Sequence, residues 1–219
     1  MDMTCRMTFL LGIFFKASII ISFFLTLTCF GQELRTKKVS PSSLKVKEEF
    51  YQVKNNPKNL EIQKKYLELF PKDYSTFSKI FDPEDFSELY DSSYEYIFIL
   101  DSISKNYPHE VGIKIIHIAK DGEEYLKRTA FISDATSYLQ DLTIRYANNF
   151  PEVFIREINH LNISEVNSLI AFLADVENHS VYNEYENFIT ILKLNKQSTL
   201  LNKFVVAKKE RMKYRHHGE

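Results

Sequence analysis

Apolar side chains recur along most of the chain at the three- and four-residue intervals that place them on one face of an α-helix. Residues 111–119 also fit the alternation of a strand, but Ile115, Ile116 and Ala119 favour a helix, which we expect to stop at Asp121-Gly122. The clearest stripes form four groups: Leu60, Tyr66, Leu67 and Phe70; Phe77, Ile80 and Phe81; Phe86, Leu89 and Tyr90; and Tyr94, Ile97, Phe98 and Ser102. The pattern predicts an all-α fold of about ten short helices, in an orthogonal array or an irregular helical-repeat solenoid.

Prolines and capping residues indicate where these helices begin and end. Three prolines follow a capping residue and are predicted to open helices, because the first helical position does not need the missing N–H. These pairs are Ser40-Pro41, Asn56-Pro57 and Asp82-Pro83. The other three follow an aromatic residue, where they end one helix and permit another to start: Pro71, Pro108 and Pro151. Asp134 and Ser164 are expected to cap helices 134–149 and 165–176, and further helices are predicted at 153–161, 182–194 and 198–213.

One aromatic pattern occurs twice. A tyrosine, a phenylalanine four residues later, an adjacent proline and a further aromatic residue occur as Tyr66, Phe70, Pro71 and Tyr74, and again as Tyr146, Phe150, Pro151 and Phe154. The flanking residues do not keep this register. The pattern fits either a twofold repeat of helical units or two independent helix–proline–helix corners.

The first 31 residues differ in character from the rest. The apolar run at 17–30 suits a secretory leader and is shorter than the roughly 20 residues of a membrane span. Cys29 and Gly31 occupy the −3 and −1 positions for a signal peptidase, so cleavage is predicted after Gly31. Two alternatives are a retained anchor, disfavoured by Lys16, and lipidation of Cys29, disfavoured by the preceding Thr28. We therefore expect an exported protein of the periplasm or the extracellular space.

The organisation predicted from these features has four parts. Residues 1–31 form a cleaved signal peptide, 32–40 a flexible lead-in, 41–215 a single all-helical domain and 216–219 a frayed tail. Both cysteines lie in the leader, so the exported chain has no disulfide and must depend on its core for stability.

Composition excludes several functional classes. A hydrophobic fraction of 44 % excludes a disordered chain, and a net charge of −1 argues against a dedicated nucleic-acid binder. The five glycines, two of them in the leader, are too few for the glycine-rich loops that hold phosphates or dinucleotides. No cofactor is predicted.

Catalytic signals are sparse. His109-Glu110 begins like a zinc-protease motif, but Ile113 occupies the place of the second histidine. His117 lies in an apolar run, where we expect a buried core residue. The densest set of metal-ligand types is Asp175, Glu177 and His179, which predicts either a divalent-cation site or a solvated loop. A metal-assisted hydrolase is thus an alternative function.

The C-terminal segment is basic, whereas the rest is acidic. Residues 196–219 carry seven basic side chains against two acidic ones. A basic amphipathic helix can lie on an anionic membrane or bind an acidic partner, although it can equally be a terminal helix docked on the core. The residues concerned are Lys203, Lys208, Lys209, Arg211, Lys213 and Arg215.

Tyrosines supply the remaining candidate surface. Their rings are suited to protein interfaces, because one end is apolar and the other polar, although helix packing uses them too. The candidates for partner binding are Tyr90, Tyr94, Tyr96, Tyr107, Tyr182 and Tyr185. The leading hypothesis is a non-enzymatic exported protein that binds a protein partner, as an adaptor or an immunity-like protein, and binds no nucleic acid.

The export leader and the aromatic corner at 69–77, with Leu89-Tyr90 after it, provide one resemblance. In these features the chain resembles uncharacterised exported all-helical proteins of Gram-negative bacteria. The resemblance implies an exported helical domain and assigns no activity or site residue.

Overall fold

The structure is a computed structural model, and it describes residues 40–81, 89–126, 133–174 and 182–215. Contacts between Cα atoms divide the chain into two units, Met1–Lys38 and Val39–Glu219. The second unit contains ten α-helices, one short 3-10 helix and no strand within the described residues. The prediction of an all-α fold is therefore confirmed.

The elements of this helical unit succeed one another with short connections. Their bounds are α2 (Pro41–Asn55), α3 (Leu60–Leu69), α4 (Tyr74–Phe81), η2 (Tyr90–Ser92), α5 (Ser93–Ile103), α6 (Pro108–Leu126), α7 (Asp134–Asn149), α8 (Pro151–Ile158), α9 (Ile163–Ala174), α10 (Tyr182–Leu194) and α11 (Ser198–Arg215). Among them, no helix combines the length and hydrophobicity that a membrane span requires.

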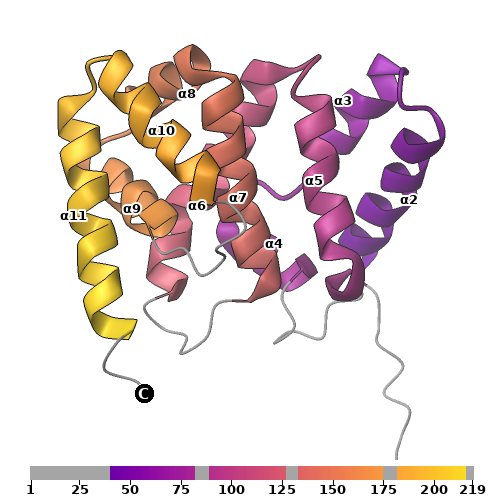
Figure 1. The fold of residues 1–219 in the computed structure, drawn as a ribbon. Helices are drawn as coiled ribbons and strands as arrows, with labels where there is room; N and C mark the ends of the chain where they lie inside the picture. The colour runs from indigo at the N-terminus through magenta and orange to yellow at the C-terminus, as the bar shows by residue number, and fades with distance from the viewer. Residues whose placement is uncertain (1–39, 82–88, 127–132, 175–181, 216–219) are drawn as a thin grey trace, which may run out of the picture. The chain divides into compact units, whose positions relative to one another are not determined.

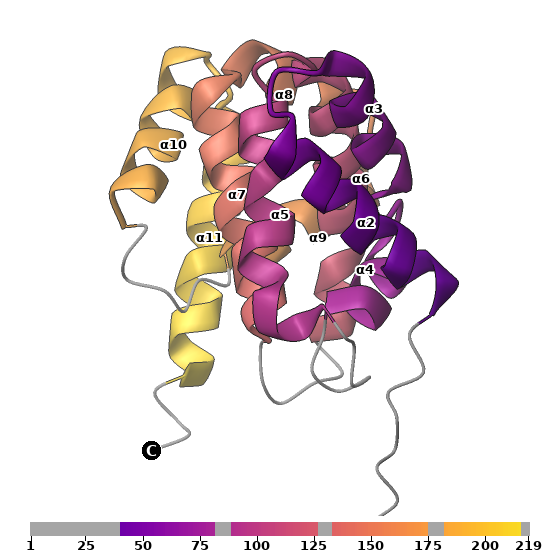
Figure 2. The same ribbon diagram turned by 90° about the vertical axis from the view of Figure 1, so that its right-hand side faces the viewer.

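Two layers of helices organise the unit (Figure 1). One layer contains α5, α7 and α10, with α7 between the other two; the second contains α6 and α9, which pack closely together. The chain runs from α2 and α3 at one end of the unit to α10 and α11 at the other, and Figure 2 shows the same layers after a quarter turn. Helices α2 and α3 pack at one end, and α11 packs on α9 and α10 at the other.

Buried aromatic rings form two groups in the core. Phe50, Phe70, Phe81 and Tyr96 are at most 4 % exposed, and the centroids of Phe50 and Tyr96 are 4.4 Å apart. A second group, Phe154, Phe188 and Phe204, packs edge-to-face towards the C-terminus. Burying each such ring contributes about 1.5–3 kcal/mol, so the described unit has a substantial core.

The capping predictions succeed at some helices and fail at others. Ser40 caps α2 as predicted, by accepting a hydrogen bond from the amide of Ser43 at 3.1 Å, and a new helix starts at Pro151, where the sequence permits one. The helix predicted at 153–161 is α8, which starts two residues earlier, at Pro151 itself, and ends at Ile158. The prediction that Pro57 opens a helix was wrong: α3 begins at Leu60, and the side chain of Asn59 caps it.

Two further helix starts differ by one or two residues from prediction. α7 is capped by Ser133, not Asp134. α9 begins at Ile163, and its cap is Asn162 rather than Ser164. Asn162 and Glu165 exchange two backbone–side-chain hydrogen bonds of 3.0 Å, which makes a reciprocal capping box.

The predicted end of a helix at Asp121-Gly122 was also wrong. α6 continues through Gly122 to Leu126. A Cβ atom at Gly122 would lie 2.5 Å from two ring carbons of Phe172 on α9. The glycine therefore permits a close approach of α6 to α9 instead of terminating α6.

The two aromatic corners share one kind of hydrogen bond but differ in where the next helix starts. Each tyrosine donates its hydroxyl to a backbone carbonyl of another element: Tyr66 to Tyr96 at 2.6 Å, and Tyr146 to Pro108 at 2.5 Å. After the first corner α4 starts only at Tyr74, whereas Pro151 begins the next helix at once. The two corners therefore position the following helix differently.

Candidate functional site

Aromatic and charged side chains gather on α7 and on the two helices beside it. We call this set the α7 strip: Tyr94 and Phe98 from α5; Tyr138, Asp141, Arg145 and Asn148 from α7; and Glu184 from α10. The α7 residues are spaced by three, four and three positions, so the helix turns all of them to the same face.

The aromatic half of the strip is a stack of three rings. Tyr94 lies 4.5 Å from Phe98 and 5.3 Å from Tyr138 between centroids, the second contact being edge-to-face. Tyr94 is nevertheless 52 % exposed. Its ring is held by neighbours while one side faces solvent, so a ligand that packs on it need not order it first.

The charged half contains polar atoms without partners. The guanidinium of Arg145 lies 5.0 Å from the centroid of Phe98, and Nη2 is 3.9 Å from Oε1 of Glu184. Its Nε is buried and has no hydrogen-bond partner among the described residues, and the same holds for Oδ1 of Asn148. Asn148 meanwhile donates its Nδ2 to the carbonyl of Glu184 at 2.9 Å. An unpaired buried donor or acceptor costs about 1–3 kcal/mol, which a ligand group or a water can recover.

Asp141 lies between these halves and is only 6 % exposed. Burial raises the pKa of its carboxyl to about 6, and the neighbouring charge of Arg145 only partly opposes this, while Glu184 adds to it. A nearby cation would stabilise the charged form of Asp141.

The structure separates the tyrosines predicted to bind a partner. Tyr94 belongs to the strip, and Tyr90 lies near it, with its hydroxyl donating to Oδ2 of Asp134 at 3.2 Å. The hydroxyl of Tyr107 donates instead to the carbonyl of Leu60 on α3, at 2.9 Å. Tyr96 and Tyr185 are buried in the core, so their rings are not surface groups, and the side chain of Tyr182 lies outside the described residues.

The sequence reasoning missed most of the strip. It did not select Phe98, Tyr138, Asp141, Arg145, Asn148 or Glu184. The signal that could have found part of it is the three-, four- and three-residue spacing that puts Tyr138, Asp141, Arg145 and Asn148 on one face of α7.

The basic C-terminal helix is docked through its first half. α11 packs on α9 and buries Leu200 and Phe204, and Lys203 donates to Oδ1 of Asn167 on α9. Lys209 is exposed. Arg211, Lys213 and Arg215 lie on the helix, but their side chains are outside the described residues. Binding of this helix to a membrane or an anionic partner stays a prediction.

The predicted metal ligands Asp175, Glu177 and His179 lie outside the described residues, as does Cys29. In the described ranges, no group of three or more His, Cys, Asp or Glu side chains is placed to hold a metal ion. His117 is exposed, so the expectation of a buried core residue was wrong. α6 turns it outward while Ile116 and Ile118 on either side are buried.

A second charged cluster connects α6 and α8. Nδ1 of His109 lies 3.1 Å from Oε1 of Glu157 and 3.0 Å from Nη2 of Arg156, while Nε of Arg156 is 3.2 Å from the same carboxylate oxygen. Each charged group thus has a close partner, and the cluster connects the start of α6 to α8. We assign it a structural role.

Comparison of the chain with family models, with curated proteins and with solved structures found no match. The functional argument therefore depends on the chemistry of the α7 strip.

Proposed function

We propose that this protein binds another protein without catalysing a reaction, and that the α7 strip is part of the binding surface. The carrying observation is the half-exposed ring of Tyr94, held on Phe98 and Tyr138 beside the guanidinium of Arg145. Tyrosine and arginine are enriched among the residues that dominate binding energy at protein interfaces.

The composition of the strip supports binding over catalysis. Covalent or acid–base catalysis needs a nucleophile or a second proton-transfer group within hydrogen-bond reach of the first. Asp141 has neighbours of another kind: the guanidinium of Arg145 and a second carboxylate, that of Glu184. These groups can orient and neutralise a ligand, which is the task of a binding surface.

Photocrosslinking tests the proposal. We would replace Tyr94 with p-benzoylphenylalanine in the cells that naturally make the protein. The matched control is Tyr51 on α2, which is 47 % exposed and also packs on a phenylalanine. We expect one discrete heterologous adduct from position 94 and none from position 51. No adduct at 94, equal adducts at both positions, or an adduct with the mass of two copies of this chain would overturn the proposal.

We further propose that this binding occurs in the periplasm or outside the cell, after removal of residues 1–31. The support is the apolar run that ends at Cys29 and Gly31. Intact-mass analysis of protein isolated from separated cell fractions tests this. We expect a chain that begins at Gln32 in the exported fraction; an uncleaved chain or one lipidated at Cys29 would contradict it.

A further inference from the structure

We propose that the α7 strip receives a lysine or arginine side chain of the partner protein, with the cationic group at Asp141 and the aliphatic stem on Tyr94 and Tyr138. This inference rests on the proposed function and names the chemistry of the partner. It follows from the charge balance of the strip and from its rings.

The charges of the strip do not balance. One guanidinium, that of Arg145, lies beside two carboxylates, Asp141 and Glu184. Among the described residues, the ion-pair approach of this guanidinium to Glu184 is a long 3.9 Å. Asp141 is more than nine-tenths buried, and a buried charge is costly unless it is paired and hydrogen-bonded. A second positive group would balance the two carboxylates.

The negative potential extends to the aromatic half. Burial together with the carboxylates of Asp134 and Asp141 raises the pKa of Tyr138. Aromatic faces attract cations, and the stems of lysine and arginine pack well on apolar rings. Arg145 already uses the ring of Phe98 in this way, whereas the exposed side of Tyr94 remains accessible.

An anionic ligand would meet Asp141, Glu184 and Asp134, and like charges brought together oppose binding. The chemistry of the strip therefore favours a basic segment over an acidic one.

The test uses single-residue probes and nuclear magnetic resonance. N-acetyl-arginine-N-methylamide and its lysine counterpart are titrated into the purified protein at about pH 7.5, where Asp141 is ionised. The glutamine and glutamate counterparts serve as neutral and anionic controls. We expect saturable amide shifts on α5 and α7 with a dissociation constant in the millimolar range for the cationic probes alone.

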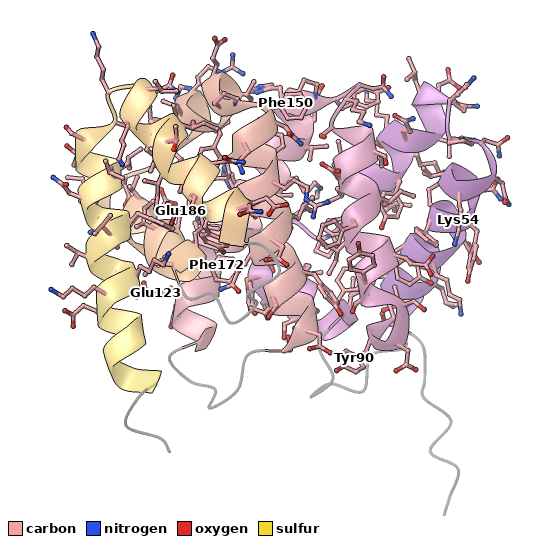
Figure 3. The ribbon with its side chains drawn as sticks, viewed as in Figure 1. Lys54, Tyr90, Glu123, Phe150, Phe172 and Glu186 are labelled. Atoms are coloured by element: carbon pink, nitrogen blue, oxygen red, sulfur yellow. The ribbon has the colours of Figure 1, made fainter. Side chains whose placement is uncertain are left out.

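Two variants identify the responsible group. Asp141→Asn should weaken binding of the cationic probes at least about fivefold, because it removes the charge and keeps the shape. Glu186→Gln removes an exposed carboxylate from α10 outside the strip and should leave binding unchanged (Figure 3). The urea unfolding midpoint of both variants is measured beside the titrations, so that a loss of binding is separated from a loss of folding.

The contrary results are equally definite. The cationic subsite would be overturned if the cationic probes show no saturation, or if the neutral or anionic probe causes equal shifts. It would also be overturned if Asp141→Asn binds the cationic probes as tightly as wild type. A heterologous crosslink at Tyr94 without probe binding would refute this inference and leave the proposed function standing. Probe binding without that crosslink would refute the proposed function instead.

Discussion

Two regions of this protein, the α6–α9 contact and the α7 strip, use charged and polar side chains in opposite ways. At the contact of α6 with α9, Nζ of Lys120 lies 2.8 Å from Oε1 of Glu165 and 3.2 Å from Oδ1 of Asp121. Glu165 also accepts from the amide of Asn162 at 3.0 Å, and the hydroxyl of Ser168 donates to the carbonyl of Lys120. On the α7 strip, Arg145 and Asn148 each keep a buried polar atom without a partner among the described residues.

Proton affinities show the same contrast. The hydrogen bond between Lys120 and Glu165 raises the pKa of the lysine and lowers the pKa of the glutamate, so each stabilises the other's charge. Burial instead raises the pKa of Asp141, so folding disfavours its charge. The α6–α9 contact is arranged for stability. The α7 strip contains groups that folding alone does not favour, and such groups often mark functional sites.

The largest effect is expected from breaking the close approach of α6 to α9. Phe172→Ala should lower the free energy of unfolding by about 3–5 kcal/mol, because it empties a fully buried ring site. Gly122→Ala should lower it by about 1–3 kcal/mol, since its methyl group would overlap that ring despite the better helix propensity of alanine. Urea unfolding followed by circular dichroism measures both; Figure 3 labels Phe172 and Glu123, the neighbour of Gly122.

The double variant is the control for this interpretation. With Phe172→Ala in place, the methyl group of Gly122→Ala enters the vacated space, so the added substitution should be neutral or stabilising. If Gly122→Ala destabilises both backgrounds equally, the close approach of the two helices is not the cause.

An intermediate effect of opposite sign is expected at the strip. Asp141→Asn should stabilise the protein at neutral pH by about 1–2 kcal/mol, because burial disfavours the charged carboxyl that it replaces. The folded-state pKa is raised, so the wild-type protein should lose stability as the pH rises from about 4 to about 6. The advantage of the variant should therefore grow over that window and vanish below it.

Urea midpoints measured across that pH range check the prediction. Glu186→Gln is the matched control and should follow the wild-type curve. A constant difference between Asp141→Asn and wild type at every pH would show that the charge of Asp141 is not the cause.

Local sequence signals were enough for the fold class and for several helices. The predicted range 182–194 agrees with α10, and α8 starts at Pro151, two residues before the predicted start at 153, because capping and proline chemistry act within a few residues. The helix end predicted at Gly122 was wrong. Glycine is a local helix-stopping signal, whereas this glycine makes room for the ring of Phe172 on another helix. Asn56-Pro57 misled the prediction because Asn59, three residues on, is the better placed cap.

The candidate site was less predictable for the same reason. Periodicity identifies which residues of one helix share a face, but not which helix lies beside that face. Tyr94, Arg145 and Glu184 come from three helices and meet only through the packing of α5 and α10 on α7. Tyr96 is buried and Tyr94 is exposed, since residues two positions apart on α5 point in different directions.

The smallest effect is expected from the ion pair at the α6–α9 contact. Glu165→Gln keeps a side-chain oxygen for the amide of Asn162 and removes only the charge that faces Lys120. Because the pKa of Glu165 is lowered in the folded protein, its contribution should be present at neutral pH and disappear as the pH falls through that lowered pKa. The loss at neutral pH should be smaller than the gain from Asp141→Asn, since water reaches this pair. A double-mutant cycle with Lys120→Met, measured by urea unfolding, isolates the pair. Zero coupling would mean that the two contacts differ only in packing and in the cost of Asp141, and not in how they use charge.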